Sequence, residues 1–253
     1  MSRRGAGTIW LLALVLLGAC SSPHPRPAAS PSASAARVVY VAVGASDSVG
    51  VGSADPIRGA WTQRFYRSAL PISATFVNVA VSGSTTAQAL QDQVPEALKL
   101  MPTLVTVWLN VNDIIHGVTP NEYRSELQSL VGQLRGGGAT TVLVANTPPL
   151  DQLPAYRACL AGAGFGGVSL CPSPVPDPAA LGAVVDAYNA ATASVAAAAG
   201  AVLVDLHAAG LAAEKDGTEA SLISPDGFHP SDAGHALVAK TFADALAASG
   251  RKE

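Results

Sequence analysis

Two serines lie on either side of an aspartate in the stretch VAVGASDSVGVG, at residues 41–52. Ser46 or Ser48 could act as a nucleophile if a base stood within hydrogen-bonding distance, because a serine hydroxyl needs a neighbour that takes its proton. Far along the chain, Asp226 and His229 are three residues apart, so in a turn both side chains can lie on one side. A hydroxyl, an imidazole and a carboxylate are the three groups that serine hydrolysis requires. The residue types therefore make hydrolysis by a serine nucleophile the first hypothesis.

Two further segments could stabilise the negatively charged oxygen that forms in such a reaction. NVAVSGSTT contains Gly83, which offers a backbone N–H, and WLNVND contains Asn112, which offers a side-chain amide. Taken singly, each residue has an ordinary structural explanation, since glycines form turns and Asn–Asp pairs cap helices. Asp113 is expected to hold the turn after Asn112, and His235 is expected to be structural at the start of the last helix. The combination with a serine and a histidine favours an active site.

Other kinds of site fit the chain poorly. The dinucleotide fingerprint G-x-G-x-x-G fails after Gly50 and Gly52, no phosphate-binding GK[ST] motif is present, and the G-x-S-x-G elbow of larger hydrolases is absent. His229 and His235 lack further zinc ligands at a suitable spacing. The net charge of -3, without a cluster of Lys and Arg, disfavours nucleic-acid binding. We therefore expect no metal, no organic cofactor and no nucleic-acid partner.

The elements that must position these residues alternate along the chain. Apolar, β-branched runs predict five strands, at 38–43, 75–79, 103–109, 140–145 and 201–205. Helical patterns lie between them, at 120–135, at 179–199 and in a last helix capped by Ser231 or Asp232. Alternating strands and helices predict a three-layer α/β/α sandwich with a five-stranded, mainly parallel sheet. Because ligands bind at the carboxyl ends of such strands, the candidate residues fall where a site is expected.

The four segments together resemble the SGNH (GDSL-type) serine hydrolases, over essentially all of residues 38–250. Gly44-Ala45-Ser46-Asp47-Ser48-Val49-Gly50 is similar to the family's first block, and Val81-Ser82-Gly83 to its second. Asn110-Val111-Asn112-Asp113 is similar to the third block, and Asp226-Gly227-Phe228-His229 to the closing DxxH block. The resemblance implies a flavodoxin-like SGNH hydrolase fold.

The same resemblance assigns roles to the residues. It implies that Ser46, rather than Ser48, is the nucleophile of a triad with Asp226 and His229. The oxyanion donors would be the backbone of Ser46, the backbone of Gly83 and the side chain of Asn112. The chain departs from the family pattern in two places, since Ala45 replaces an Asp and Asn110 replaces a Gly.

The implied activity is cleavage of carboxylic esters through an acyl-enzyme, with a small-molecule, lipid or glycan ester as substrate. Two alternatives within the enzymes are a glycan deacetylase and a lysophospholipase-like activity. A third alternative is an inactive SGNH scaffold that binds cell-envelope glycan or lipid. The intact Ser46, Asp226 and His229 favour an enzyme, and we expect a monomer.

The N-terminal region predicts export. Arg3 and Arg4 precede an apolar run that ends in Leu17-Gly18-Ala19-Cys20, which resembles a bacterial lipobox. We therefore expect a lipoprotein signal peptide at 1–19, lipid on Cys20, and a disordered Pro/Ser/Ala tether over 20–37. The protein would then be extracytoplasmic and anchored to the membrane. An ordinary signal peptide, and hence a secreted protein, is the alternative.

Two further cysteines, Cys159 and Cys171, lie in a Gly- and Pro-rich loop that shows no clear periodicity, from about 148 to 178. Outside the cytoplasm such a pair predicts a disulfide. The loop follows the fourth predicted strand, so it leaves the sheet at the edge where the site is expected. We expect it to form one wall of a substrate pocket, with an apolar surface made by Leu153, Tyr156, Leu160 and Phe165.

Overall fold

The computed structural model describes residues 37–163, 171 and 174–250. The chain divides into two units, Met1–Ala35 and Ala36–Glu253, and the fold below is that of the second. The predicted signal peptide, Cys20, the tether before Arg37 and Phe165 lie outside the described residues. Within the described part, no helix is both long enough and apolar enough to cross a bilayer.

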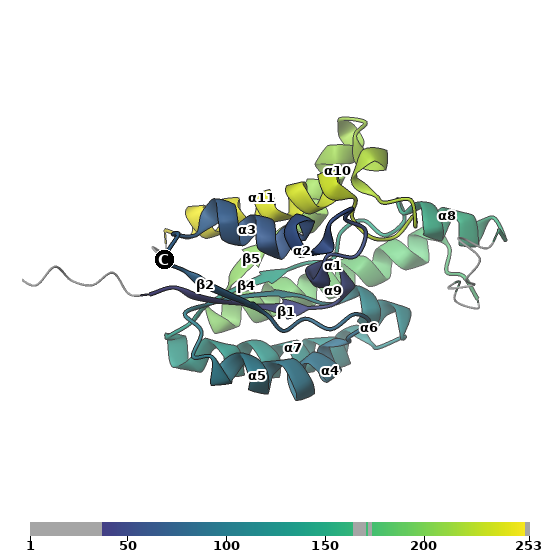
Figure 1. The fold of residues 1–253 in the computed structure, drawn as a ribbon. Coiled ribbons are helices and arrows are strands. Elements are labelled where there is room, and N and C mark those ends of the chain that lie inside the picture. Colours follow the sequence, from purple (N-terminus) through teal and green to yellow (C-terminus); the bar gives the residue numbers. More distant parts are fainter. Residues whose placement is uncertain (1–36, 164–170, 172–173, 251–253) are drawn as a thin grey trace, which may run out of the picture. The chain divides into compact units, whose positions relative to one another are not determined.

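The centre of the fold is a five-stranded sheet in which every pairing is parallel (Figure 1). The strand order is β2-β1-β3-β4-β5, so the first strand lies inside the sheet. All five predicted strands are present, each within a residue or two of its predicted ends: β1 (Val39–Gly44), β2 (Thr75–Asn78), β3 (Leu104–Trp108), β4 (Thr141–Ala145) and β5 (Val202–Val204).

Helices connect the strands and cover both faces of the sheet (Figure 1). The predicted helix at 120–135 is confirmed, and the predicted helix at 179–199 begins one residue earlier. The α-helices are α1 (Ser46–Val49), α2 (Pro56–Gly59), α3 (Trp61–Ala69), α4 (Thr86–Gln88), α5 (Val94–Lys99), α6 (Val111–Ile115), α7 (Pro120–Arg135), α8 (Pro154–Leu160), α9 (Pro178–Ala199), α10 (Leu206–Lys215) and α11 (Asp232–Ala248). Three short segments complete the set: the π-helix η1 (Ala89–Gln93) and the 3₁₀ helices η2 (Gly136–Gly138) and η3 (Glu219–Leu222).

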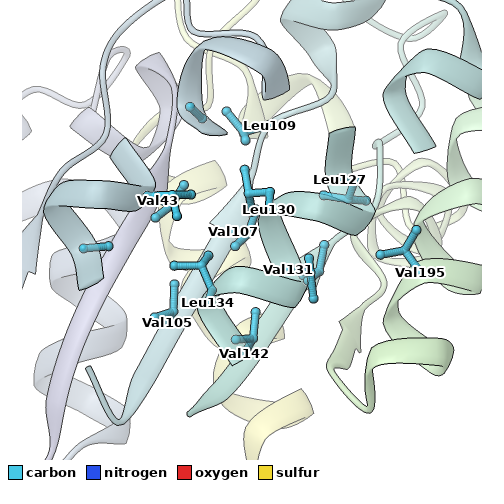
Figure 2. Close-up of a cluster of buried hydrophobic side chains, with 14 of the residues drawn as sticks. Val43, Val105, Val107, Leu109, Leu127, Leu130, Val131, Leu134, Val142 and Val195 are labelled. Atoms are coloured by element: carbon cyan, nitrogen blue, oxygen red, sulfur yellow. The ribbon is translucent and has the colours of Figure 1, made fainter. Parts of the chain in front are cut away.

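Successive side chains of the strands point to opposite faces, so the sheet has a separate core on each side. One core joins Val43, Val107 and Val142 of the strands to Leu127 and Leu130 of α7 and to residues of η1, α5 and α9 (Figure 2). Both faces of the strands are apolar, as expected for a parallel sheet covered by helices on both sides.

The other core is aromatic and packs the sheet against α3 and α11. Tyr40 of β1 stacks on Phe76 and meets Phe65 edge to face. Trp61 of α3 stacks on Phe242 of α11, with ring centroids 4.3 Å apart. These contacts fix α11 next to the segment that follows β1, and so bring distant parts of the chain to one edge of the sheet.

The loop after β4 is more regular than its composition suggests, since it contains the helix α8. Pro154 stands at the first helical position, where its fixed φ suits a helix start and its missing N–H leaves no bond unmade. Seven residues are too few to show a helical period in the sequence. A disulfide joins Cys159 at the end of α8 to Cys171, as the sequence predicts.

Candidate active site

Ser46 lies where β1 gives way to α1, at the carboxyl edge of the sheet. Its hydroxyl oxygen is 2.9 Å from Nε2 of His229, although the two residues are 183 positions apart. Ser48 is fully buried on the other side of the same turn. A Cβ at Gly44 would lie 2.1 Å from the Ser48 hydroxyl, so the glycine leaves the room that this packing needs. Of the two serines, Ser46 is the one that faces an imidazole.

Asp226 and His229 form a compact turn before α11. One carboxylate oxygen of Asp226 lies 2.7 Å from Nδ1 of His229, and the other accepts the backbone N–H groups of Phe228 and His229, each at 2.9 Å. Burial alone would raise the pKa of Asp226, but these hydrogen bonds outweigh it and lower the pKa to about 2. The carboxylate is therefore ionised at neutral pH. It accepts the Nδ1 proton, which leaves Nε2 free to accept from the Ser46 hydroxyl.

Backbone contacts hold this turn against its neighbours. The N–H of Ser224 donates to the carbonyl of His229 at 2.9 Å, and the N–H of Ser231 donates to the carbonyl of Leu222 at 2.8 Å. The loop that follows α1 packs closely on the same turn at Gly52, whose φ is +93°. A Cβ there would lie 2.2 Å from the carbonyl oxygen of Pro230, so only glycine fits.

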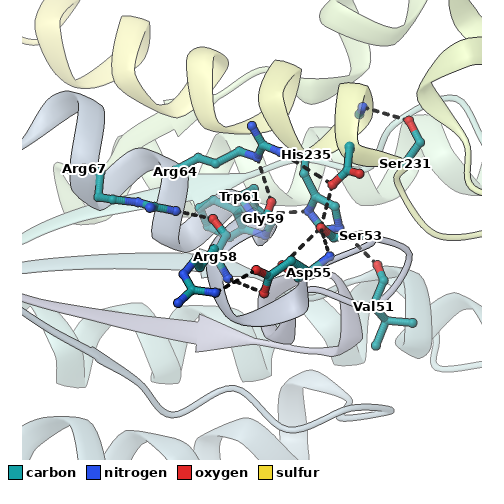
Figure 3. Close-up of polar contacts among 12 residues, drawn as sticks. Val51, Ser53, Asp55, Arg58, Gly59, Trp61, Arg64, Arg67, Ser231 and His235 are labelled. Carbon is teal, nitrogen blue, oxygen red and sulfur yellow. Dashed lines mark hydrogen bonds and ion pairs between the residues drawn. The ribbon is translucent and has the colours of Figure 1, made fainter.

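A polar network around His235 fastens the start of α11 to the segment after α1 (Figure 3). Nδ1 of His235 accepts the N–H of Trp61 at 3.2 Å, and Nε2 lies 3.1 Å from the carbonyl of Val51. Burial lowers the pKa of His235, which keeps the ring neutral with its proton on Nε2. Beside it, the Ser53 hydroxyl donates to Asp232 at 2.6 Å. His235 is thus structural, as the sequence suggests.

Gly83 and Asn112 come to the same edge of the sheet as Ser46. Gly83 lies in a turn with φ at +82°, a conformation that favours glycine. Asn112 is in the first turn of α6, and its side-chain nitrogen donates to the carbonyl of Ser84 at 3.1 Å. The two segments that carry the candidate oxyanion donors are therefore bonded to one another. That bond also fixes the orientation of the Asn112 amide.

Asp113 does more than hold the local turn. Its carboxylate accepts backbone N–H groups of Asn110 and Asp113, and it also accepts the backbone N–H of Thr86 at 3.0 and 3.1 Å and the Thr86 hydroxyl at 3.0 Å. Burial raises the pKa of Asp113, and the bonds from Thr86 oppose that effect. Asp113 therefore ties the segment of Asn112 to the segment of Gly83 through Thr86, which lies 27 residues from Asp113 along the chain.

Asn110 stands where the resembled SGNH pattern has a glycine, and its backbone conformation is one that favours glycine. Its φ of 71° and ψ of -49° are those of a classic γ-turn, which the bond from the N–H of Val111 to the carbonyl of Leu109 closes at 2.9 Å. A non-glycine residue is strained there. The side-chain amide of Asn110, fully buried, donates to the carbonyl of Ala145 at 3.2 Å and offsets part of that strain.

Gln93 is a positioning residue that the sequence analysis missed. Its side chain is buried in η1, where its oxygen accepts the N–H of Gly44 and its nitrogen donates to the carbonyl of Gly44, both at 2.9 Å. The same nitrogen lies 3.1 Å from the Ser84 hydroxyl. Gln93 thus braces the turn that carries Ser46 against the turn that carries Gly83. In the sequence, the only hint of this role is that Gln93 is a polar residue between the apolar positions Leu90 and Val94. Such a hint is weak by itself.

Asp47 directly follows Ser46, and its carboxylate accepts its own backbone N–H. Asp47 also lines a cavity that begins beside the candidate site. Burial raises the pKa of Asp47 to about 6, and the nearby His229 opposes part of this rise. Asp47 is therefore a carboxyl group next to Ser46 that changes its charge at about pH 6.

The cavity has a volume of about 160 Å³ and lies between the loop after β4, α8, α10, η3 and the start of α11. Leu153, one of the residues expected on a pocket wall, lines this cavity. Tyr156 instead packs beside it and donates its hydroxyl to the carbonyl of Pro176, and Leu160 is half exposed on the far end of α8. Across the described ranges, no three His, Cys, Asp or Glu side chains converge as metal ligands.

Comparisons with known proteins agree with this architecture. The model of the GDSL-like Lipase/Acylhydrolase family matches residues 27–237. Three solved structures are similar in fold. The crystal structure of TesA is 22% identical, with a TM-score of 0.59, and the match covers 83% of this chain and 99% of that one. A putative GDSL-like lipase from Parabacteroides merdae is 16% identical, with a TM-score of 0.62 and coverage of 85% and 97%.

The third is a two-domain esterase described as active on acetylated mannans. It is 18% identical with a TM-score of 0.61, and the match covers 86% of this chain and 50% of that one. No curated protein sequence matches the chain significantly.

Proposed function

Because the chain belongs to the GDSL-like lipase/acylhydrolase family, we propose that it hydrolyses carboxylic esters through an acyl-enzyme on Ser46. The observation that carries this proposal is the continuous chain of hydrogen bonds from the Ser46 hydroxyl through His229 to Asp226. Residues from the two ends of the domain meet here, Ser46 with His229 at 2.9 Å and His229 with Asp226 at 2.7 Å, so His229 can take the Ser46 proton while Asp226 orients the imidazole.

In the first half of the proposed reaction, the Ser46 oxygen attacks the ester carbonyl carbon while Nε2 of His229 takes the hydroxyl proton. Asp226 stays ionised, holds the imidazole through its Nδ1 proton and stabilises the imidazolium. The tetrahedral intermediate then collapses, the bond to the alcohol oxygen breaks, and His229 gives its proton to the leaving alcohol. The acyl group remains on Ser46 as an ester.

In the second half, His229 takes a proton from water, and the resulting hydroxide attacks the acyl carbon. The acid leaves when His229 returns that proton to the Ser46 oxygen. The backbone N–H groups of Ser46 and Gly83 and the second amide hydrogen of Asn112 stabilise the oxyanion in both halves. The Ser46 N–H suits this role, since the first N–H groups of a helix have no acceptor within the helix.

A glycan deacetylase is the second candidate, favoured by the likeness to the esterase described as active on acetylated mannans. It uses the same chemistry with a sugar as the alcohol. Parallel assays with p-nitrophenyl acetate and with an acetylated glycan separate the two, each repeated with Ser46→Ala. Hydrolysis of the simple ester that depends on Ser46 supports the main proposal. A Ser46→Ala variant that keeps the full wild-type activity would contradict it.

An inactive scaffold that binds glycan or lipid is the alternative outside enzymes. It predicts no turnover of any ester and no difference between the wild type and Ser46→Ala. The intact hydrogen-bond chain argues against it, because a binding surface has no need of a serine, a histidine and an ionised carboxylate in this order.

We further propose that the protein is held at the outer face of a membrane by lipid on Cys20. The basis is the sequence around Leu17-Gly18-Ala19-Cys20 alone. Cys20→Ala should release the protein from the membrane fraction while the specific activity stays unchanged, because the domain begins at β1. Mass spectrometry of the mature N-terminus is the check, and an unmodified N-terminus at any other residue would refute the anchor.

A further inference from the structure

The cavity beside Ser46 has a position that ties it to the candidate active site. Asp47, Val111 and Phe228 line one end of it, and they are the sequence neighbours of Ser46, Asn112 and His229. One cavity therefore meets the nucleophile turn, the helix that carries the oxyanion amide and the turn that carries the base. Ser46, Asn112 and His229 are not themselves among its lining residues, so the cavity begins one residue beyond the reacting groups.

The wall of the cavity is mostly hydrocarbon. Its apolar side chains include Leu150, Leu153, Leu206, Leu222, Ile223 and Val238. Alkyl groups gain about 0.8 kcal/mol for each CH₂ that leaves water for such a surface. Two carboxylates, Asp47 and Glu219, also line it, while Arg157 contributes a positive charge from α8. This lining suits a neutral alkyl chain better than one that ends in a carboxylate.

The wall is fastened to the catalytic turn. The N–H of Ala155 in α8 donates to the carbonyl of Gly227, between Asp226 and His229, at 3.0 Å. The Arg157 side chain donates to the carbonyl of Asp151 at 3.2 Å, and the disulfide closes the other end of α8. These contacts fix the position of Leu153 relative to His229. A cavity can select substrates by size only if its wall is held in place in this way.

From this geometry we infer that the cavity binds the acyl chain of the ester and limits its length to about six carbons. This inference rests on the proposed function and specifies its substrate class as esters of short, unbranched, neutral acids. The limit follows from the volume, because an apolar cavity of about 150 Å³ in another protein holds one benzene molecule. The present cavity, at about 160 Å³, is of similar size.

The test is a series of p-nitrophenyl esters from acetate to dodecanoate, assayed with the whole chain. For the wild type we expect kcat/KM to rise from acetate to about the six-carbon ester and to fall at least tenfold by the twelve-carbon ester. Leu153→Ala should enlarge the cavity and raise the ratio of ten-carbon to four-carbon kcat/KM about tenfold. Ala209→Leu, in the part of the wall that α10 provides, should lower the ratio of six-carbon to two-carbon kcat/KM by a similar factor.

Two matched control variants lie on the same helices, α8 and α10, but at positions that do not line the cavity. Leu160→Ala on α8 and Leu211→Ala on α10 remove side chains that are each 46% exposed. Both should leave the chain-length profile unchanged. A mono-succinyl ester should react at least tenfold more slowly than the butyryl ester of equal length, because of Asp47 and Glu219.

The outcomes separate the inference about the acyl chain from the proposed ester hydrolysis on which it rests. If the wild type and all variants hydrolyse p-nitrophenyl acetate but the length profiles of Leu153→Ala and Ala209→Leu match that of the wild type within about twofold, the acyl chain lies elsewhere and the inference is wrong. If the wild type hydrolyses no ester of the series, the proposed function itself fails. Circular dichroism of each variant confirms that an altered profile comes from a folded protein.

Discussion

The two halves of the candidate site are held in different ways. The nucleophile half, Ser46 with Gly83 and Asn112, is braced by contacts between residues far apart in the sequence, and within it Ser46 is buried, Asn112 is half-buried and Gly83 is exposed. The acid–base half, Asp226 with His229, is organised by bonds between residues two or three apart. Its carboxylate has a side-chain exposure of 43%, whereas Ser46 is only 9% exposed.

This difference indicates where the precision of the site comes from. A turn that makes its own hydrogen bonds needs little from the rest of the fold except to be placed, and β-turn chemistry is readable in a short sequence. The nucleophile half depends on buried amides and carboxylates such as Gln93 and Asp113. Losing such a partner leaves a buried polar group unpaired. The nucleophile half should therefore be the more sensitive to substitutions outside the triad.

The largest expected effect is on the two serines of the opening motif. Ser46→Ala should lower kcat for p-nitrophenyl butyrate by about 10⁴-fold or more, since triad nucleophiles typically account for several orders of magnitude. Ser48→Ala should retain most of the activity, because its hydroxyl faces Gly44 and not His229. Equal losses in two folded variants would mean that the assignment of the nucleophile is wrong.

Next in size is the effect of removing the charge of Asp226. Asp226→Asn should lower kcat by about 10³ to 10⁴-fold, because an amide does not hold the imidazole in the tautomer that accepts the serine proton. The pKa of Asp226 is lowered to about 2, so the carboxylate of the wild type stays ionised down to about pH 3. If Asp226→Asn keeps more than a tenth of the wild-type kcat at pH 8, the carboxylate does not orient His229.

A smaller effect is expected for Gln93→Leu, which tests the bracing of the nucleophile half. The N–H of Gly44 loses its acceptor, which costs about 1–3 kcal/mol of stability. We expect kcat to fall about 10- to 100-fold with KM changed less than threefold, since the defect lies in the position of Ser46.

Gln91→Leu is the matched control, because Gln91 is exposed in the same π-helix. It should leave kcat unchanged. Thermal unfolding of both variants separates stability from positioning. A Gln93→Leu protein that unfolds earlier but keeps its kcat would show that Gln93 supports the fold alone.

The smallest expected effect is a pH-dependent gain in stability for Asp47→Asn. The pKa of Asp47 is raised to about 6 in the folded protein, above its value in an unfolded chain, so the folded state binds the proton more tightly. Stability from this group is therefore fully present below about pH 4 and is lost as the pH rises through about 6. Asp47→Asn should raise the Tm by several degrees at pH 8 relative to the wild type, with the difference shrinking at pH 4. An equal change in Tm at both pH values would contradict this account.

The sequence predicts the strands and helices better than the contacts that hold the candidate site in place. The strands and the long helices are visible because their periodic apolar faces are determined by two cores that cover both sides of the sheet. Ser46, Asp226 and His229 could be proposed from the sequence because Ser46 follows a predicted strand, Asp226 and His229 are three residues apart, and the resemblance to the SGNH hydrolases favours Ser46 over Ser48. Gln93 and the cavity are not, because each depends on contacts between segments whose separation along the chain says nothing about their distance in space.

The cavity also shows why the loop after β4 was only partly predictable. Leu153 faces it because Pro154 starts α8 there and the Ala155 N–H bonds to Gly227, a contact across 72 residues. Leu160, seven residues later, is as apolar in the sequence and yet points away. Seven residues of helix are enough to turn one side chain to the cavity and another to solvent, but they are too few to show that pattern in advance.

The most direct test of the central claim is to label the protein with a fluorophosphonate and to locate the adduct by peptide mass spectrometry. Only a serine whose proton is taken by a neighbouring base reacts rapidly with such a probe. The account predicts a single adduct on the peptide that carries Ser46, present in Ser48→Ala and abolished in Ser46→Ala and in His229→Ala. A folded wild-type protein that remains unlabelled, or an adduct that persists in Ser46→Ala, would contradict it.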